Sequence, residues 1–74
     1  MRVLLIEDEL QLRERLVASL HAEGFAVDAT GSGAEGVYLG SEYPIDVAIV
    51  DLGLPDVSGT EIIRQWRESD LSFP

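Results

Sequence analysis

Three acidic residues stand directly after the two most apolar runs of the chain. Residues 3–6 (VLLI) lead into Glu7 and Asp8, and residues 47–50 (VAIV) lead into Asp51. Short, nearly all-apolar runs rich in β-branched residues are typical of strands that are buried on both faces of a parallel sheet. If these strands are neighbours, the three carboxylates meet at the carboxyl edge of the sheet, where open α/β sheets bind ligands. Because like charges repel, we expect the cluster to bind a cation or to share a proton.

Magnesium and phosphoryl groups fit the chemistry of such a cluster. Mg²⁺ is usually held by one or two carboxylates together with waters and phosphate oxygens, and the carbonyl of Gly53 is the best candidate for a further ligand. The ion would relieve the repulsion and neutralise charge on an incoming phosphoryl group. Asp51, alone at the end of its strand, is the candidate nucleophile that would form an acyl phosphate. The competing interpretation is that these residues are solvated loop positions or helix caps, and spacing alone predicts only a cation-binding acidic pocket.

Composition limits the classes of function. Seventy-four residues form one small domain at most, and 46% apolar with 26% charged residues is typical of a globular protein. A net charge of −9, with five arginines and no lysine, argues against nucleic-acid binding by this segment. No apolar run approaches the roughly 20 residues of a membrane span. Without cysteine there are no disulfides or thiolate metal sites, and we expect a soluble, cytoplasmic protein with no membrane contact.

The elements that would position the carboxylates alternate between strands and helices. Ser32 with Glu35, and Ser58 with Glu61, form capping boxes that predict two of the helix starts. The order is β-α-β-α-β-α, which predicts part of a doubly wound α/β fold with parallel strands and right-handed crossovers. The six expected elements are a strand at 3–6, a helix at 10–23, a strand at 25–29, a helix at 32–39, a strand at 45–50 and a helix at 58–68.

Apolar residues at helical spacing are the expected core positions outside the strands. They are Leu12, Leu16, Val17, Leu20, Ile62, Ile63 and Trp66. Tyr38 and Tyr43 are expected to pack around the second helix, which Gly36 and Gly40 should make the least stable one. His21 is expected on the surface.

The segments that carry these carboxylates resemble the receiver domain of bacterial two-component response regulators. The matching stretches are residues 3–9 (VLLIEDE) and 47–59 (VAIVDLGLPDVSG). Residues 46–67 are most similar to PhoP-type members of the OmpR/PhoB subfamily. In that loop, Pro55 and Gly59 match positions that shape the turn after the phosphoacceptor, proline by fixing φ and glycine by allowing a backbone angle that other residues resist.

The resemblance implies a role for each acidic residue. Asp51 would accept a phosphoryl group from a sensor histidine kinase. Asp8, Asp51 and the carbonyl of Gly53 would coordinate Mg²⁺, with Glu7 acting through a water. The domain would be a signalling module rather than an enzyme, and in the full-length protein it would control dimerisation, DNA binding and transcription.

The chain also departs from the family pattern. Family receivers have five strands in the order 2-1-3-4-5, with a switch Ser or Thr on the fourth strand and a phosphate-pairing lysine after the fifth. This chain has no lysine, and residues 72–74 stand where the fourth strand should begin. We therefore expect residues 1–74 to be the N-terminal portion of a receiver, a truncated flavodoxin-like fold with sheet order 2-1-3 and without its last two strands. DNA would be bound only through a C-terminal domain that is absent from the chain.

Two consequences are expected from this departure. Without the lysine, phosphorylation of Asp51 should be impaired, because a cation that stabilises the transferred charge is lost. The strand at 45–50 should form an open, apolar edge that is incompletely covered, and such edges recruit another chain. We therefore expect self-association through this strand.

Three other functions remain as alternatives. A haloacid-dehalogenase-like phosphatase would need a second aspartate two positions after Asp51, where Gly53 stands. A P-loop NTPase would need a G-x-x-x-x-G-K-[ST] stretch, which the chain lacks. A non-signalling interaction fragment that associates through its open edge does not conflict with the resemblance and stays open.

Overall fold

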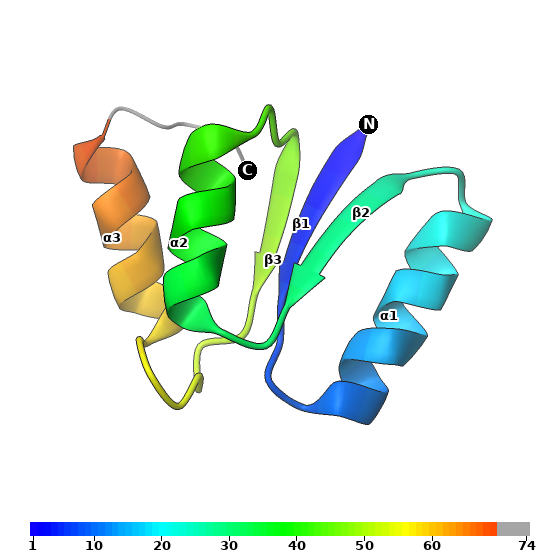
Figure 1. The fold of residues 1–74 in the computed structure, drawn as a ribbon, viewed down its shortest axis with the longest axis horizontal. Helices are drawn as coiled ribbons and strands as arrows, with labels where there is room; N and C mark the ends of the chain where they lie inside the picture. Colours follow the sequence, from blue (N-terminus) through cyan, green and yellow to red (C-terminus); the bar gives the residue numbers. More distant parts are fainter. Residues whose placement is uncertain (70–74) are drawn as a thin grey trace.

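A computed structural model describes residues 1–69 as a three-stranded parallel sheet with three helices (Figure 1). The sheet order is β2-β1-β3, so the predicted order 2-1-3 is confirmed. Observed and predicted bounds differ by at most three residues, the largest difference being at the end of α2, and the fourth-strand start predicted at residues 72–74 lies outside the described residues. The elements are β1 (Arg2–Ile6), α1 (Leu10–Ala22), β2 (Ala26–Thr30), α2 (Gly33–Glu42), β3 (Val47–Val50) and α3 (Gly59–Glu68).

The central strand β1 is buried on both faces, as its apolar run predicts. Residues 3–6 are at most 3% exposed. Ile6 pairs with Thr30 of β2 on one side and with Val50 of β3 on the other, so all three strands end at the same edge. This register brings the residues that follow β1 and β3 to one edge of the sheet.

The main core lies between the sheet and the α2–α3 pair. It is formed by residues from β1, from the flanks of β3 and from α3, namely Leu4, Ile6, Ile45, Leu54, Ile62 and Trp66. Two glycines of α2 allow this packing, because a Cβ at Gly36 would stand 2.2 Å from Ile6 Cδ1 and a Cβ at Gly40 would stand 2.6 Å from the Trp66 ring. The sequence-based interpretation of these glycines as weak points therefore missed their main role. They are the sites where the helix approaches its neighbours.

The other face of the sheet is covered only in part. Helix α1 contacts β1 and β2, and Figure 1 shows it apart from the α2–α3 pair. None of its residues is buried, and Leu12 is exposed, so the predicted apolar stripe covers less than expected. Ile49 of β3 is 41% exposed. The prediction that β3 is incompletely covered is confirmed.

Several predicted packing positions are wrong for a simple geometric reason. Ile62 and Trp66 are four residues apart and share the inward face of α3, as predicted, whereas Ile63 is rotated by about 100° and is 39% exposed. Tyr38 and Tyr43 are exposed rather than packed around α2, and the Tyr43 ring lies 5.5 Å from the Arg2 guanidinium. Consecutive residues of a helix are rotated by about 100° from one another, so Ile62 and Ile63 cannot share one face.

No helix within residues 1–69 combines the length and the apolar character that crossing a bilayer requires.

Candidate functional site

The last hydrogen bonds of the parallel ladders fix the backbone of two acidic residues. Glu7 N–H donates to the carbonyl of Thr30 at 3.0 Å, and Asp51 N–H donates to the carbonyl of Ile6 at 2.9 Å. Each acidic residue therefore continues the pairing one position beyond its strand. The apolar runs determine the strands, and the strands in turn set Glu7 and Asp51 at the same sheet edge.

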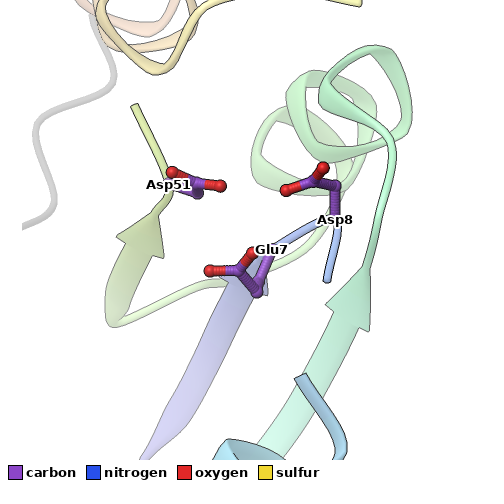
Figure 2. A group of neighbouring side chains, drawn as sticks. All are labelled: Glu7, Asp8 and Asp51. Carbon is purple, nitrogen blue, oxygen red and sulfur yellow. The ribbon is translucent and has the colours of Figure 1, made fainter. Parts of the chain in front are cut away.

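Three carboxylates converge at this edge, as predicted. Glu7, Asp8 and Asp51 each offer an oxygen within 4.8 Å of the others. Figure 2 shows Glu7 at the end of β1, Asp8 on the segment that follows, and Asp51 beyond β3. Glu7 and Asp51 are half-buried and Asp8 is exposed. The site is thus open to solvent and reachable by a ligand.

The donor set fits Mg²⁺. This ion takes oxygen ligands at about 2.0–2.1 Å in an octahedron, so ligands on opposite sides of it are about 4 Å apart. Carboxylate oxygens separated by no more than 4.8 Å need only small movements to surround one such ion. Hard carboxylate oxygens are also the ligand type that Mg²⁺ prefers. When bound, the ion would neutralise charge within the cluster and on an incoming phosphoryl group.

Asp51 is held in its ionised form. The Gly53 N–H donates to Asp51 Oδ1 at 3.0 Å, and this bond is the main reason that the pKa of Asp51 is lowered from its ordinary value. Partial burial acts in the opposite direction. An ionised carboxylate is the form that can coordinate a cation or act as a nucleophile.

The segment after β1 is fixed by two contacts that the sequence did not reveal. Arg13 Nη1 donates to the Glu7 carbonyl at 2.8 Å, and Glu9 N–H donates to Glu7 Oε2 at 3.0 Å. Glu9 also caps α1 by accepting bonds from Gln11 N–H and Leu12 N–H. The only sequence feature that could have indicated the Arg13 contact is the position of this arginine, in the first turns of the helix that follows an acidic run.

The loop after Asp51 needs glycine at position 59, where α3 begins, although not for the predicted reason. Among residues 1–69 only Gly24 is a glycine with positive φ, so an unusual backbone angle at Gly59 is excluded. Instead, a Cβ at Gly59 would stand 2.6 Å from the Asp51 carbonyl oxygen and 2.8 Å from Leu52 Cα. Glycine is needed here because the start of α3 passes close to the phosphoacceptor candidate. Gly53 and Pro55 are exposed within this loop.

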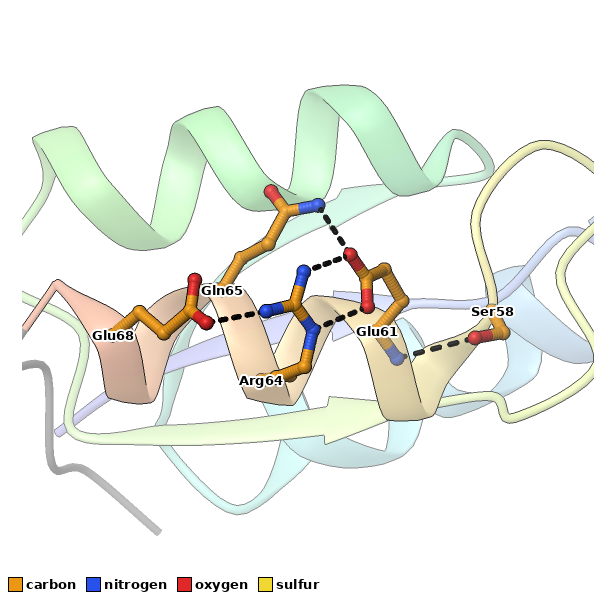
Figure 3. Close-up of polar contacts among 5 residues, drawn as sticks. All are labelled: Ser58, Glu61, Arg64, Gln65 and Glu68. Carbon is orange, nitrogen blue, oxygen red and sulfur yellow. Dashed lines mark hydrogen bonds and ion pairs between the residues drawn. The ribbon is translucent and has the colours of Figure 1, made fainter.

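The exposed face of α3 forms its own polar network (Figure 3). Ser58 Oγ accepts a bond from Glu61 N–H at 3.1 Å, which confirms the predicted cap. Arg64 donates to Glu61 and to Glu68, and Gln65 also reaches Glu61. The Arg64 guanidinium is thus bound along its own helix. These contacts stabilise the helix that begins directly after the site.

An open parallel sheet with this acidic cluster at its carboxyl edge is characteristic of phosphoacceptor receivers, and comparison with known proteins establishes the family. Residues 3–74 match the family model described as "Response regulator receiver domain". The chain belongs to this family.

Relatives at the sequence level are transcriptional regulators. The chain is 50% identical over 74 residues to the "Virulence transcriptional regulatory protein PhoP" of Salmonella choleraesuis (strain SC-B67). It is 45% identical over the same length to the "Two-component response regulator PhoP" of Pseudomonas aeruginosa. All of this chain but only 33% of each relative is covered, so the chain spans a third of the length of the curated relatives it matches. It is a PhoP-like receiver sequence.

Solved structures with the same fold include receivers in several states. The Francisella response regulator 1452 receiver domain superposes with a TM-score of 0.94 over 99% of this chain and 60% of that one, and at 19% identity it shows the fold alone. The response regulator TrrA of Thermotoga maritima, solved in complex with Mg²⁺-BeF, has a TM-score of 0.87 and 31% identity over 92% of this chain and 59% of that one. TrrA was also solved with the histidine kinase ThkA, with a TM-score of 0.84 and 31% identity over 90% and 58% of the respective chains.

Proposed function

We propose that Asp51 is the phosphoacceptor of this receiver, with a Mg²⁺ ion held by Asp8, Asp51 and the Gly53 carbonyl and by Glu7 through a water. The observation that carries the proposal is the convergence of three carboxylates at the carboxyl edge of the sheet, one of them at the end of β3. Membership of the receiver family supports the same assignment. Residues 1–74 would then be the N-terminal portion of the receiver domain.

In this proposal an ionised oxygen of Asp51 attacks the phosphorus of a phosphohistidine on a sensor kinase. The new bond joins Asp51 to phosphorus, and the bond between phosphorus and the histidine nitrogen breaks with its electron pair going to nitrogen. The Gly53 N–H keeps Asp51 ionised and fixes one carboxylate oxygen, leaving the other for the attack. The complete receiver would act as a phosphoryl acceptor in signalling rather than as an enzyme.

The proposed partners follow from the same chemistry. The likeness to TrrA, which was solved with the histidine kinase ThkA, supports a kinase as the phosphoryl donor. The names of the PhoP relatives support a role in transcription. For the full-length protein we propose dimerisation, with DNA contacted by a separate C-terminal domain. The proposal also implies a cytoplasmic location, because a regulator of transcription must reach the DNA.

The experiment that tests the proposal is a Mg²⁺ titration of the chain and of its Asp51→Asn variant, followed by NMR at the backbone amides. We expect saturable shifts at residues 7, 8, 51 and 53 in the wild type and a loss of about 10-fold or more in affinity in the variant. A small phosphodonor is then added with Mg²⁺, and any adduct is mapped by mass spectrometry. Equal Mg²⁺ affinity in the wild type and in the Asp51→Asn variant would contradict the proposal, as would a phosphoryl adduct at another residue.

A second candidate function is self-association through the edge of the sheet. Strand β3 pairs with β1 on one side, and no strand within residues 1–69 pairs with its other side. Ile49 is exposed on this strand, and Leu52 is exposed just after it. An unpaired apolar edge is a template for another strand. We propose a second copy of the chain as the occupant.

A further inference from the structure

The first turn of α2 has a side-chain acceptor for every backbone donor that the helix leaves free. Helices begin with four N–H groups that lack intrahelical partners. Ser32 N–H donates to Thr30 Oγ1 at 3.1 Å, and Glu35 N–H donates to Ser32 Oγ at 3.2 Å. The other two donors, on Gly33 and Ala34, are bound by a residue from a distant part of the chain.

That residue is Asp56, which lies in the loop between β3 and α3. Its Oδ1 accepts from Gly33 N–H at 2.9 Å, and its Oδ2 accepts from Ala34 N–H at 3.0 Å. Ser32 Oγ donates to the same Oδ2 at 3.2 Å. The carboxylate thus joins the loop to a helix start that lies 22 to 24 positions earlier in the sequence.

The contact is close-packed as well as hydrogen-bonded. A Cβ at Gly33 would stand 2.9 Å from Asp56 Oδ1 and 3.1 Å from Val57 Cβ. Val57 packs against the main core, and Leu54 on the other side of Asp56 is buried in it. The middle of the loop therefore packs directly against the start of α2, and a side chain at Gly33 would not fit between them.

This loop is the one that carries the candidate carbonyl ligand. It leaves β3 at Asp51, passes through the exposed Gly53 and reaches Asp56 three residues later. Gly53 N–H is bound to Asp51, so the path of the chain around Gly53 is fixed at its start by Asp51 and further along by Asp56. A carbonyl ligand for a small, strictly octahedral ion depends on such a path, because Mg²⁺ tolerates little deviation in ligand geometry.

We propose that Asp56 is a positioning residue of the acidic site: by binding the start of α2 it fixes the loop that presents the Gly53 carbonyl beside Asp51. This inference rests on the proposed function, since it assumes that Gly53 is a metal ligand. The backbone N–H groups of Ala34 and Gly33 lower the pKa of Asp56 to about 2, so the contact is made by a charged carboxylate at neutral pH. The positive end of the α2 dipole favours the same charge.

The test compares Asp56→Ala and Asp56→Asn with the wild type in the 74-residue chain. Both variants lose the same charge, but asparagine keeps one carbonyl oxygen that can accept from the start of α2. We expect the Gly53 amide to exchange with solvent several-fold faster in the alanine variant without any Mg²⁺. We expect Mg²⁺ affinity, measured by NMR titration, to fall about 10-fold in the alanine variant and less in the asparagine variant.

Asp28→Asn is the matched control, because it also removes one charge and breaks an ion pair, with Arg2, away from the loop. Equal Mg²⁺ affinity and equal Gly53 exchange in the folded alanine variant and the wild type would overturn the inference, as would an equal loss in Asp28→Asn. If the alanine variant does not fold, the same comparison is read between the asparagine variant and the wild type. A wild type that does not bind Mg²⁺ would refute the proposed function. The exchange rates of the Gly53 amide would still show whether Asp56 fixes the loop.

Discussion

The backbone N–H of Asp51 donates to the Ile6 carbonyl at 2.9 Å, so the candidate phosphoacceptor makes the last bond between β3 and β1. Its position is therefore set by the backbone, and its side chain takes no part in the strand pairing. A substitution at Asp51 that keeps the backbone intact should change the acidic site without changing the sheet. The site and the fold can thus be tested separately.

The first prediction concerns Mg²⁺ and stability. An ion that binds only the folded chain at ten times its Kd should raise the free energy of unfolding by about 1.4 kcal/mol. We expect this gain in urea denaturation of the wild type and its loss on adding EDTA. Asp51→Asn, which removes one of the three converging carboxylates, should show little gain at the same Mg²⁺ concentration. An equal gain in both proteins would mean that the ion binds elsewhere.

The second prediction concerns the contact between Gly40 and Trp66. In an exposed helix, replacing glycine by alanine stabilises by about 1 kcal/mol. At Gly40 the new methyl group would stand 2.6 Å from a buried indole ring, so we expect Gly40→Ala to destabilise the fold by about 1–3 kcal/mol instead. Ser41→Ala, at the next and exposed position, is the control and should change stability by less than about 0.5 kcal/mol. Urea denaturation of both variants measures the difference.

These contacts show where prediction from sequence succeeded and where it could not. The apolar runs identify β1 and β3, and since parallel strands end at one edge, the convergence of Glu7, Asp8 and Asp51 follows from their positions after those runs. Helix propensity depends only on the local sequence. It therefore predicts that Gly40 destabilises its helix, but it cannot predict that the Trp66 ring packs against this glycine.

Contacts between segments that are far apart in the chain also could not be predicted from the sequence. Asp56 and its partners on α2 are more than 20 residues apart, and neither segment carries a pattern that pairs them. The sequence also predicts Ile63 as a core residue of α3, together with Ile62 and Trp66, and this prediction is wrong. Ile62 is fully buried whereas Ile63 is 39% exposed, and apolar character alone does not distinguish them.

The third prediction concerns acid. The pKa of Asp56 is lowered from 3.8 to about 2 by backbone N–H bonds, and the pKa of Glu61 is lowered from 4.5 to about 2, mainly by its bond with Arg64. Groups with a lower pKa in the folded state stabilise it fully above their ordinary pKa, and this contribution is lost as the pH falls through the folded-state value. Stability should therefore decrease from about pH 4.5 down to about pH 2.

Charge-neutral variants check this pH dependence. Asp56→Asn and Glu61→Gln cannot titrate, so each should flatten part of the decrease when unfolding by urea is followed between pH 5 and pH 2. An unchanged slope in both variants would assign the acid sensitivity to other carboxylates.

The fourth prediction concerns phosphorylation of the 74-residue chain. It contains no lysine. Arg2 is bound to Asp28, Arg13 to the Glu7 carbonyl, and Arg64 to Glu61 and Glu68. No lysine can therefore stabilise the transferred charge. We expect no stable acyl phosphate when the chain is incubated with a small phosphodonor and Mg²⁺. A robust, long-lived mass increase on Asp51 would refute this expectation.

The last prediction concerns the edge of the sheet. Ile49 is 41% exposed on β3, whose outer side pairs with no strand of residues 1–69. We expect the wild-type chain to sediment at up to twice the monomer mass as its concentration rises, and more so in high salt, because salt screens the repulsion between chains of net charge −9. Lysine on an edge strand opposes strand pairing, so Ile49→Lys should remain monomeric.

Ile63→Lys is the matched control for that variant, since Ile63 is 39% exposed but lies on α3. It introduces the same charge at a similar exposure without touching the β3 edge, so it should associate as the wild type does. If Ile63→Lys and Ile49→Lys weaken association equally, the effect comes from net charge and the interface lies elsewhere. A wild type that stays monomeric at high concentration and high salt would show that the exposed edge of β3 does not recruit a second copy.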